Sequence, residues 1–233
     1  MKYSLRLIII ICFFLVLFIP PLTFSETKTA AGERLKKENP SSASSNLTAP
    51  VVRYHEGDKL IKEAADHFNR GIDYHKRGDL KKAIEYYSKT IALNPKHAEA
   101  YSHRGAAHLQ LGNFKQAIED CNKAITLNPK DANSYNNRGA ANNNLGNYKQ
   151  AITDFDKFIA LNPKHAKAYD NRGAAHYNLG NYKQAITDFD KSIALNPKDA
   201  KVYYDRSGAY ARLGNSKQSM ADLKAAAKLG DKI

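Results

Sequence analysis

Histidines and cysteines are the side chains of this 233-residue chain best suited to bind a metal ion. The chain has eight histidines, but His103 and His108 are five residues apart, a spacing that puts them on different faces of a helix. Its two cysteines are Cys12, inside an apolar N-terminal run, and Cys121, so no disulfide framework or four-cysteine metal site is expected. We therefore predict no metal ion and no cofactor.

Two pairs of carboxylates, Asp154 with Asp156 and Asp188 with Asp190, are candidates for acid–base catalysis. Residues two apart on a helix point to different faces, so these pairs are better interpreted as surface or ion-paired charges. The sequence has no Gly-rich phosphate loop after a strand, no nucleophile elbow and no His-Glu-x-x-His. We predict that the protein is not an enzyme.

Asparagine is concentrated between Asn133 and Asn144, where six occur within twelve residues. Each asparagine costs a helix roughly 0.6 kcal/mol relative to alanine, so the presence of six in one helix calls for an explanation. Amide side chains both donate and accept hydrogen bonds and could pair with the backbone of an extended peptide. The alternative is drift on a solvated surface after internal duplication.

A 34-residue period organises these side chains. Leu-Asn-Pro recurs at 93–95, 127–129, 161–163 and 195–197, and a repeat of this length indicates stacked helix pairs. In the unit that begins at Ala132, one helix is expected over 132–145 and another over 148–161, because Gly146 can end the first, Asn147 can cap the second and Pro163 stops it. The periodicity predicts an all-α chain.

The chain resembles the tetratricopeptide repeat family. The family's small eighth residue, its alanine at position 20 and its aromatic at position 24 occur in successive units as Gly71, Gly105, Gly139 and Gly173, as Ala83, Ala117, Ala151 and Ala185, and as Tyr87, Phe155 and Phe189. The resemblance implies a right-handed superhelical solenoid of antiparallel helix pairs. Its five units are 64–97, 98–131, 132–165, 166–199 and 200–233, and the last departs from the pattern at Ser207, Ser219 and Asp231.

In this family the first helices of the units line a peptide-binding groove. Carried over, the groove positions that could contact a peptide are Asn133, Asn136, Asn137, Asn143, Lys167, Asn171, Tyr177 and Lys201. A clamp for a C-terminal carboxylate is not expected, because Ser102, Ala106 and Asp205 stand where the family's clamp has lysine, asparagine and a basic residue. The resemblance implies a non-enzymatic scaffold or adaptor whose partner is a protein or peptide, with an acidic partner as one option.

Two side-chain types recur at fixed positions of successive units. Tyrosines stand at the fourth position, a packing site in the family, and arginines at the seventh: Tyr101, Tyr135, Tyr169 and Tyr203, and Arg104, Arg138, Arg172 and Arg206. The arginines either pair with neighbouring carboxylates as a ladder or form an exposed basic stripe. The net charge of +13 leaves open an anionic polymer or lipid as ligand, with nucleic acid less favoured because the lysines are dispersed. Homo-oligomerisation through the C-terminal edge is a further alternative.

The N-terminal residues 1–25 have the pattern of a secretory signal. Lys2 and Arg6 precede an apolar run over 7–19, which is short for a membrane anchor. We expect cleavage after Ser25 and export to the periplasm or the exterior; the alternative is an uncleaved anchor over 7–24. Residues 26–63 are predicted to be a flexible Ser/Pro-containing linker followed by the start of the first helix. Within the linker, Asn46 begins a glycosylation sequon.

Overall fold

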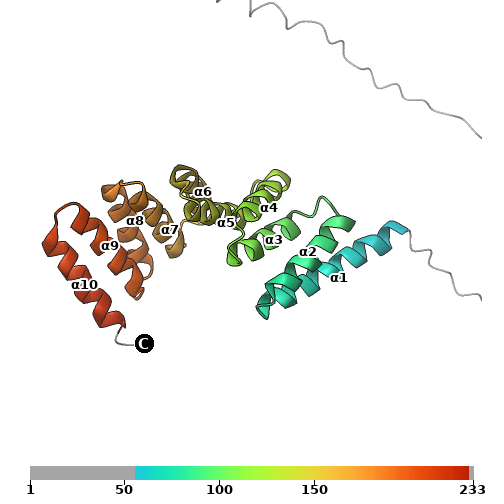
Figure 1. The fold of residues 1–233 in the computed structure, drawn as a ribbon, viewed down its shortest axis with the longest axis horizontal. Helices are drawn as coiled ribbons and strands as arrows, with labels where there is room; N and C mark the ends of the chain where they lie inside the picture. The colour runs from blue at the N-terminus through green and yellow to red at the C-terminus, as the bar shows by residue number, and fades with distance from the viewer. Residues whose placement is uncertain (1–55, 231–233) are drawn as a thin grey trace, which may run out of the picture. The chain divides into compact units, whose positions relative to one another are not determined.

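The computed structural model describes residues 56–230, and these residues form ten α-helices and no strand (Figure 1). The helices are α1 (Glu56–Lys76), α2 (Leu80–Leu93), α3 (Ala98–Gln110), α4 (Phe114–Leu127), α5 (Ala132–Asn144), α6 (Tyr148–Leu161), α7 (Ala166–Asn178), α8 (Tyr182–Leu195), α9 (Ala200–Arg212) and α10 (Ser216–Gly230). The expectation of an all-α solenoid of helix pairs is confirmed for this part of the chain.

The two helices of each unit are joined by a glycine turn. Gly146 follows α5 with φ +79°, a left-handed conformation that side chains with a Cβ rarely adopt, and the equivalent glycines of the other units have the same sign of φ. The expected cap by Asn147 is not formed, although Asn147 occupies the N-cap position of α6. Its amide donates to Oδ1 of Asn142 at 3.3 Å instead, whereas the carboxylate of Asp79 does cap α2 by accepting from the Lys82 backbone N–H.

The helices of a pair approach closely because the eighth residue is glycine. A Cβ on Gly173 would lie 2.8 Å from Cε1 of Phe189, which is too close for two carbon atoms, and Gly139 faces Phe155 in the same way. Phe189 fills the space over Gly173 and is only 1% exposed. The small eighth residue and the aromatic at position 24 are therefore one packing unit.

Consecutive pairs stack by placing the first helix of one unit on the second helix of the unit before it: α3 on α2, α5 on α4, α7 on α6 and α9 on α8. Ala168 of α7 packs on Phe158 and Ile159, and Ala175 packs on Ala151 and Phe155. The first helices also contact each other along the stack, α3 with α5, α5 with α7 and α7 with α9. These helices therefore form one continuous row, which is the row that carries the predicted peptide contacts.

The repeated arginines form the ladder that was one of the two sequence interpretations. Arg172 donates from Nε and Nη2 to Asp188 of its own unit, at 2.9 and 2.6 Å, and from Nη1 to Asp156 of the preceding unit, at 2.6 Å. Arg206 joins Asp222 and Asp190 in the same way. Each guanidinium therefore ties two consecutive units together through charge-assisted hydrogen bonds, and hydrogen bonding to these carboxylates raises the pKa of Arg172 and Arg206 further above its ordinary value.

The repeated tyrosines serve packing, as expected. The Tyr169 ring lies beneath the guanidinium of Arg172, 5.7 Å from its Cζ, and its hydroxyl donates to the Pro163 carbonyl at 3.0 Å. Tyr135 and Tyr203 make the same bond to Pro129 and Pro197. These three tyrosines therefore link their helices to the preceding Asn-Pro turn.

The signal and linker expected over residues 1–55 lie outside the described residues, as does Asn46. Within residues 56–230, no helix is both long and apolar enough to cross a bilayer.

Candidate functional site

The asparagines of the predicted groove lie on α5 and α7 and are partly accessible. Asn136 and Asn137 of α5 and Asn171 of α7 are each half-buried, and within residues 56–230 their side-chain amides have no hydrogen bond to the protein. Oδ1 of Asn143 is buried, also without a partner among the described residues. The structure thus leaves a set of amide groups on one row of helices with hydrogen-bonding capacity to spare.

The two predicted lysines lie side by side around a buried carboxylate. Asp170 is 1% exposed, and its Oδ2 is 2.6 Å from Nζ of Lys167 and 3.8 Å from Nζ of Lys201 on the next unit. Lys201 is also bonded to Asp205. Two ammonium groups thus face two carboxylates, so this part of the row has no surplus positive charge for an acidic ligand.

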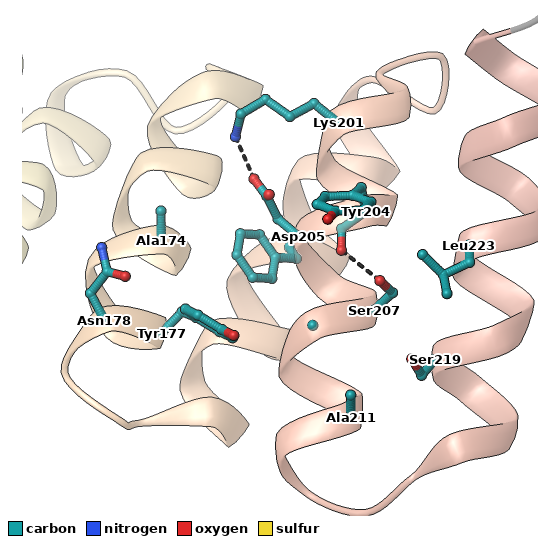
Figure 2. A pocket seen from close by; sticks show the side chains of 12 residues that line it. Ala174, Tyr177, Asn178, Lys201, Tyr204, Asp205, Ser207, Ala211, Ser219 and Leu223 are labelled. Carbon is teal, nitrogen blue, oxygen red and sulfur yellow. Dashed lines mark hydrogen bonds and ion pairs between the residues drawn. The ribbon is translucent and has the colours of Figure 1, made fainter.

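A cavity of about 540 Å³ opens beside Lys201, between α7, α9 and α10 (Figure 2). Tyr177 approaches it from α7, Tyr204 and Asp205 from α9, and Leu223 from α10. Tyr204 is 64% exposed and Leu223 37% exposed. Aromatic and aliphatic surface surrounding a few polar groups is the usual composition of a site that binds a side chain or small ligand.

The cavity exists because the fifth unit departs from the repeat. Ser207 replaces the eighth-position glycine, and its hydroxyl donates to the Tyr204 carbonyl at 2.6 Å. Leu223 replaces the aromatic that covers this position in three of the other four units, and it remains partly exposed where Phe189 is buried. Gly208 follows where Ala174 stands one unit earlier, and the hydroxyl of Tyr177 reaches to 3.5 Å from where a Cβ on Gly208 would lie. Leucine in place of phenylalanine and glycine in place of alanine therefore leave a hollow in this unit, although Ser207 is larger than the glycine it replaces.

A second, more polar hollow of about 360 Å³ lies toward the other end of the row. Asn133 lines it from α5 and Glu99 and His103 line it from α3, with Phe68 and Asp131 at its sides. The sequence-predicted residues are therefore not one compact cluster. Asn133 belongs to this hollow, Tyr177 and Lys201 to the larger cavity, and Asn136, Asn137, Asn143 and Asn171 to the helices that carry the row between them.

Sequence reasoning missed Tyr204, Gly208 and Leu223 as site residues. Tyr204 occupies the fifth position of its unit, the same position as the predicted groove residue Asn136, and this equivalence is the signal that could have found it. Asp205 was identified from the sequence only as a departure from the carboxylate clamp. Leu223 gave no signal, since a leucine at position 24 indicates a buried side chain unless the packing opposite it is known.

The other chemically capable side chains are explained by the fold. Within residues 56–230, no three histidine, cysteine or acidic side chains come together as a group that could hold a metal ion. Cys121 is 0% exposed, and burial raises the pKa of its thiol to about 12, as expected for a small apolar group in the core. Asp188 and Asp156 are both engaged by Arg172.

Comparison with known families supports the repeat assignment. Family models described as tetratricopeptide repeat match residues 98–131, 132–165, 166–199 and 200–229, and a model described as TPR repeat matches 71–112. These matches together span residues 71–229, which is more than half of the chain.

Solved structures and one curated relative are similar to this chain. A crystal structure of MamA protein is 26% identical with a TM-score of 0.67, over 73% of this chain and 93% of that one. MamA from Desulfovibrio magneticus RS-1 is 20% identical (TM-score 0.69; 73% and 96% covered). YrrB, described as a TPR protein with an unusual peptide-binding site, is 21% identical (TM-score 0.65; 75% and 92% covered). The last two similarities show the fold alone.

Among curated proteins, an uncharacterized protein of Methanocaldococcus jannaschii is 39% identical over 44 residues, which are 19% of this chain and 51% of that protein. The chain spans about half the length of this relative.

Proposed function

Because the chain belongs to the tetratricopeptide repeat family, we propose that it is a non-enzymatic adaptor that binds an extended segment of a partner protein along the row α3, α5, α7 and α9. In this proposal the cavity between α7, α9 and α10 holds one large side chain of the segment. The observation that carries the proposal is that cavity, since it lies on the row of first helices and combines about 540 Å³ with exposed apolar surface.

The cavity favours an aromatic or large aliphatic side chain. Tyr177, Tyr204 and Leu223 offer apolar contact area, and removing such area from water is worth about 25 cal/mol per Å². The ammonium groups of Lys167 and Lys201 are already paired with Asp170 and Asp205. The preferred anchor is therefore apolar, and an acidic partner becomes the secondary option.

The asparagines supply the second part of the proposal. Asn137 and Asn171 occupy the same position in consecutive units, and their amides could accept from and donate to the backbone of an extended segment. Such pairing does not depend on the side chains of the ligand, so specificity would come from the residue in the cavity. A single short segment bound this way should have micromolar affinity, about −8 kcal/mol.

The proposed setting is outside the cytoplasm. The N-terminal residues 1–25 support export, either as a cleaved signal or as an anchor over 7–24. Removing Lys2 and Arg6 with a signal would lower the net charge only from +13 to +11. The partner would accordingly be an exported or membrane-anchored protein.

The experiment selects peptides from a random 12-residue display library on the full chain and measures each by fluorescence anisotropy. Gly208→Leu is the test variant, because Gly208 lines the cavity and the new side chain would extend into it beside Tyr177. Ala194→Leu places the same leucine side chain at an exposed position of α8 and is the control. We expect selected peptides to share an aromatic or large aliphatic residue, and to lose about tenfold or more in affinity to Gly208→Leu alone.

A second pair of variants separates the two parts of the site. Asn137→Ala with Asn171→Ala should weaken every selected peptide by a similar factor, because backbone pairing is independent of ligand sequence. Peptides that bind Gly208→Leu as tightly as the parent chain would contradict the cavity assignment. Failure to select any peptide would contradict groove binding as a whole.

A further inference from the structure

The outer face of α10 is uncovered among the described residues. The equivalent helices α2, α4, α6 and α8 each lie beneath the first helix of the next unit, but within residues 56–230 only α9 packs against α10 (Figure 1). Met220 is 55% exposed and Leu223 37% exposed, whereas the side chain equivalent to Leu223 in the preceding unit, Phe189, is 1% exposed. We call the surface around Met220, Leu223 and Lys224 the α10 face.

The four internal interfaces define what covers such a face. In three of them the covering helix presents two small residues seven positions apart with an arginine between them, and in α9 the first of the two is Val202. On α7 the three residues are Ala168, Arg172 and Ala175. Both alanines are 0% exposed and lie on apolar side chains of α6. Arg172 donates to Asp156 on the helix beneath, and Arg206 donates to the equivalent Asp190. At the other two interfaces Arg104 and Arg138 donate to the uncharged Ser88 and Asn122, so the helix beneath supplies a matching charge at two of the four interfaces.

The α10 face keeps the apolar part of this pattern and reverses the charge. Lys224 stands where α6 has Asp156 and α8 has Asp190. A covering helix with arginine in the middle would put two cations together, whereas a carboxylate there would accept a hydrogen bond from the Lys224 ammonium. The complement of this face is therefore an acidic helix.

A second copy of this chain does not supply that helix. The first helix of the stack, α1, carries Asp66, Arg70 and Asp73 at the three interface positions, and all three are exposed. Stacked on the α10 face, the two aspartates would be buried against apolar residues, and Arg70 would meet Lys224. The single acidic residue of α10, Asp222, is buried and bonded to Arg206. Both ends of the stack thus oppose continuation by the chain itself.

We propose that the α10 face binds an acidic amphipathic helix of a partner protein, with a small residue at position i, aspartate or glutamate at i+4 and a small residue at i+7. The helix would cover Met220 and Leu223 and pair its carboxylate with Lys224. The α10 face shares Leu223 with the rim of the cavity, but Met220 and Lys224 do not line that cavity, so Met220 and Lys224 test this site separately from the groove.

The test uses two staple-stabilised helical peptides with the sequence of residues 166–178, in which the three positions are Ala168, Arg172 and Ala175. One peptide carries Arg172→Glu and the other keeps the arginine. Binding to the full chain and to its Lys224→Glu variant is measured by fluorescence anisotropy. We expect the full chain to prefer the glutamate peptide by about three- to tenfold, the range for partly exposed charge pairs, and Lys224→Glu to reverse the preference.

Two outcomes would overturn the proposal. One is an equal affinity of the full chain for both peptides, or a preference that Lys224→Glu does not change. The other is unchanged binding to Met220→Asp, which places a charge at an exposed residue in the middle of the face and should abolish binding without disturbing the core. Self-association of the chain that Met220→Asp removes would instead assign the face to a second copy, against the charge argument.

Discussion

The arginine ladder gives the sharpest prediction, because one guanidinium bonds to two carboxylates in different environments. The Arg172 side chain is 22% exposed, while those of its partners Asp188 and Asp156 are 6% and 54% exposed. Arg172→Met would leave Asp188 as a nearly buried charge without its partner. Breaking a fully buried pair costs about 3–5 kcal/mol, and since Arg172 itself is partly solvated we expect about 2–3 kcal/mol.

The exposed partner provides the matched comparison. Asp156→Asn removes a solvated charge from the same guanidinium and should cost less than about 1 kcal/mol. Asp188→Asn introduced into Arg172→Met should restore part of the lost stability, because it neutralises the carboxylate that the first change left unpaired. The order of stability is then parent, Asp156→Asn, the double variant and Arg172→Met.

Urea unfolding followed by circular dichroism measures this order. Since a repeat stack can unfold unit by unit, amide hydrogen exchange in α7 and α8 is recorded beside the urea midpoint. An Asp156→Asn variant as unstable as Arg172→Met would refute the reasoning, since it would mean that burial of Asp188 does not set the energy of the pair.

Three further predictions follow from burial. Gly173→Ala should destabilise the fold by about 1–3 kcal/mol, because its Cβ would lie 2.8 Å from Phe189. Gly208→Ala has room for a Cβ and should be neutral or stabilising by up to about 1 kcal/mol. Thermal unfolding of the two variants checks this difference, and equal effects on stability would contradict it. Burial lowers the pKa of His176 below its ordinary value, so the unfolded chain binds the proton more readily and stability is lost as the pH falls below about 6.5. His176→Asn should make the rise of unfolding free energy with pH between about 5 and 7 less steep, although burial also lowers the pKa of His103 and His108; an unchanged curve would show that His176 is not one of the groups responsible. The Cys121 thiol, with its pKa raised to about 12, should react with a disulfide reagent only after unfolding when the other cysteine is serine; fast labelling of the folded chain would contradict its burial.

The repeat period determined the helices and much of the packing. Gly173 and Phe189 could be paired from the sequence, because they hold fixed positions in a unit whose two helices must lie side by side. From the sequence, Arg172 could belong either to a ladder of ion pairs or to an exposed basic stripe. The structure was needed to choose between them, because its partners Asp188 and Asp156 are each sixteen residues from the arginine, in opposite directions along the chain.

Only the tertiary structure decided which charges are paired and where a cavity forms. Lys167 and Lys201 are 34 residues apart, and nothing local indicates that both ammonium groups meet the buried Asp170. The cavity likewise depends on the sizes of Tyr177 and Leu223, and the packing of helices from different units brings these two side chains together. Secondary structure follows from interactions between near neighbours in the sequence and was therefore predictable. Cavities and charge neutralisation arise between helices, where one substitution in a nearly identical unit can open a cavity or leave a charge without its partner.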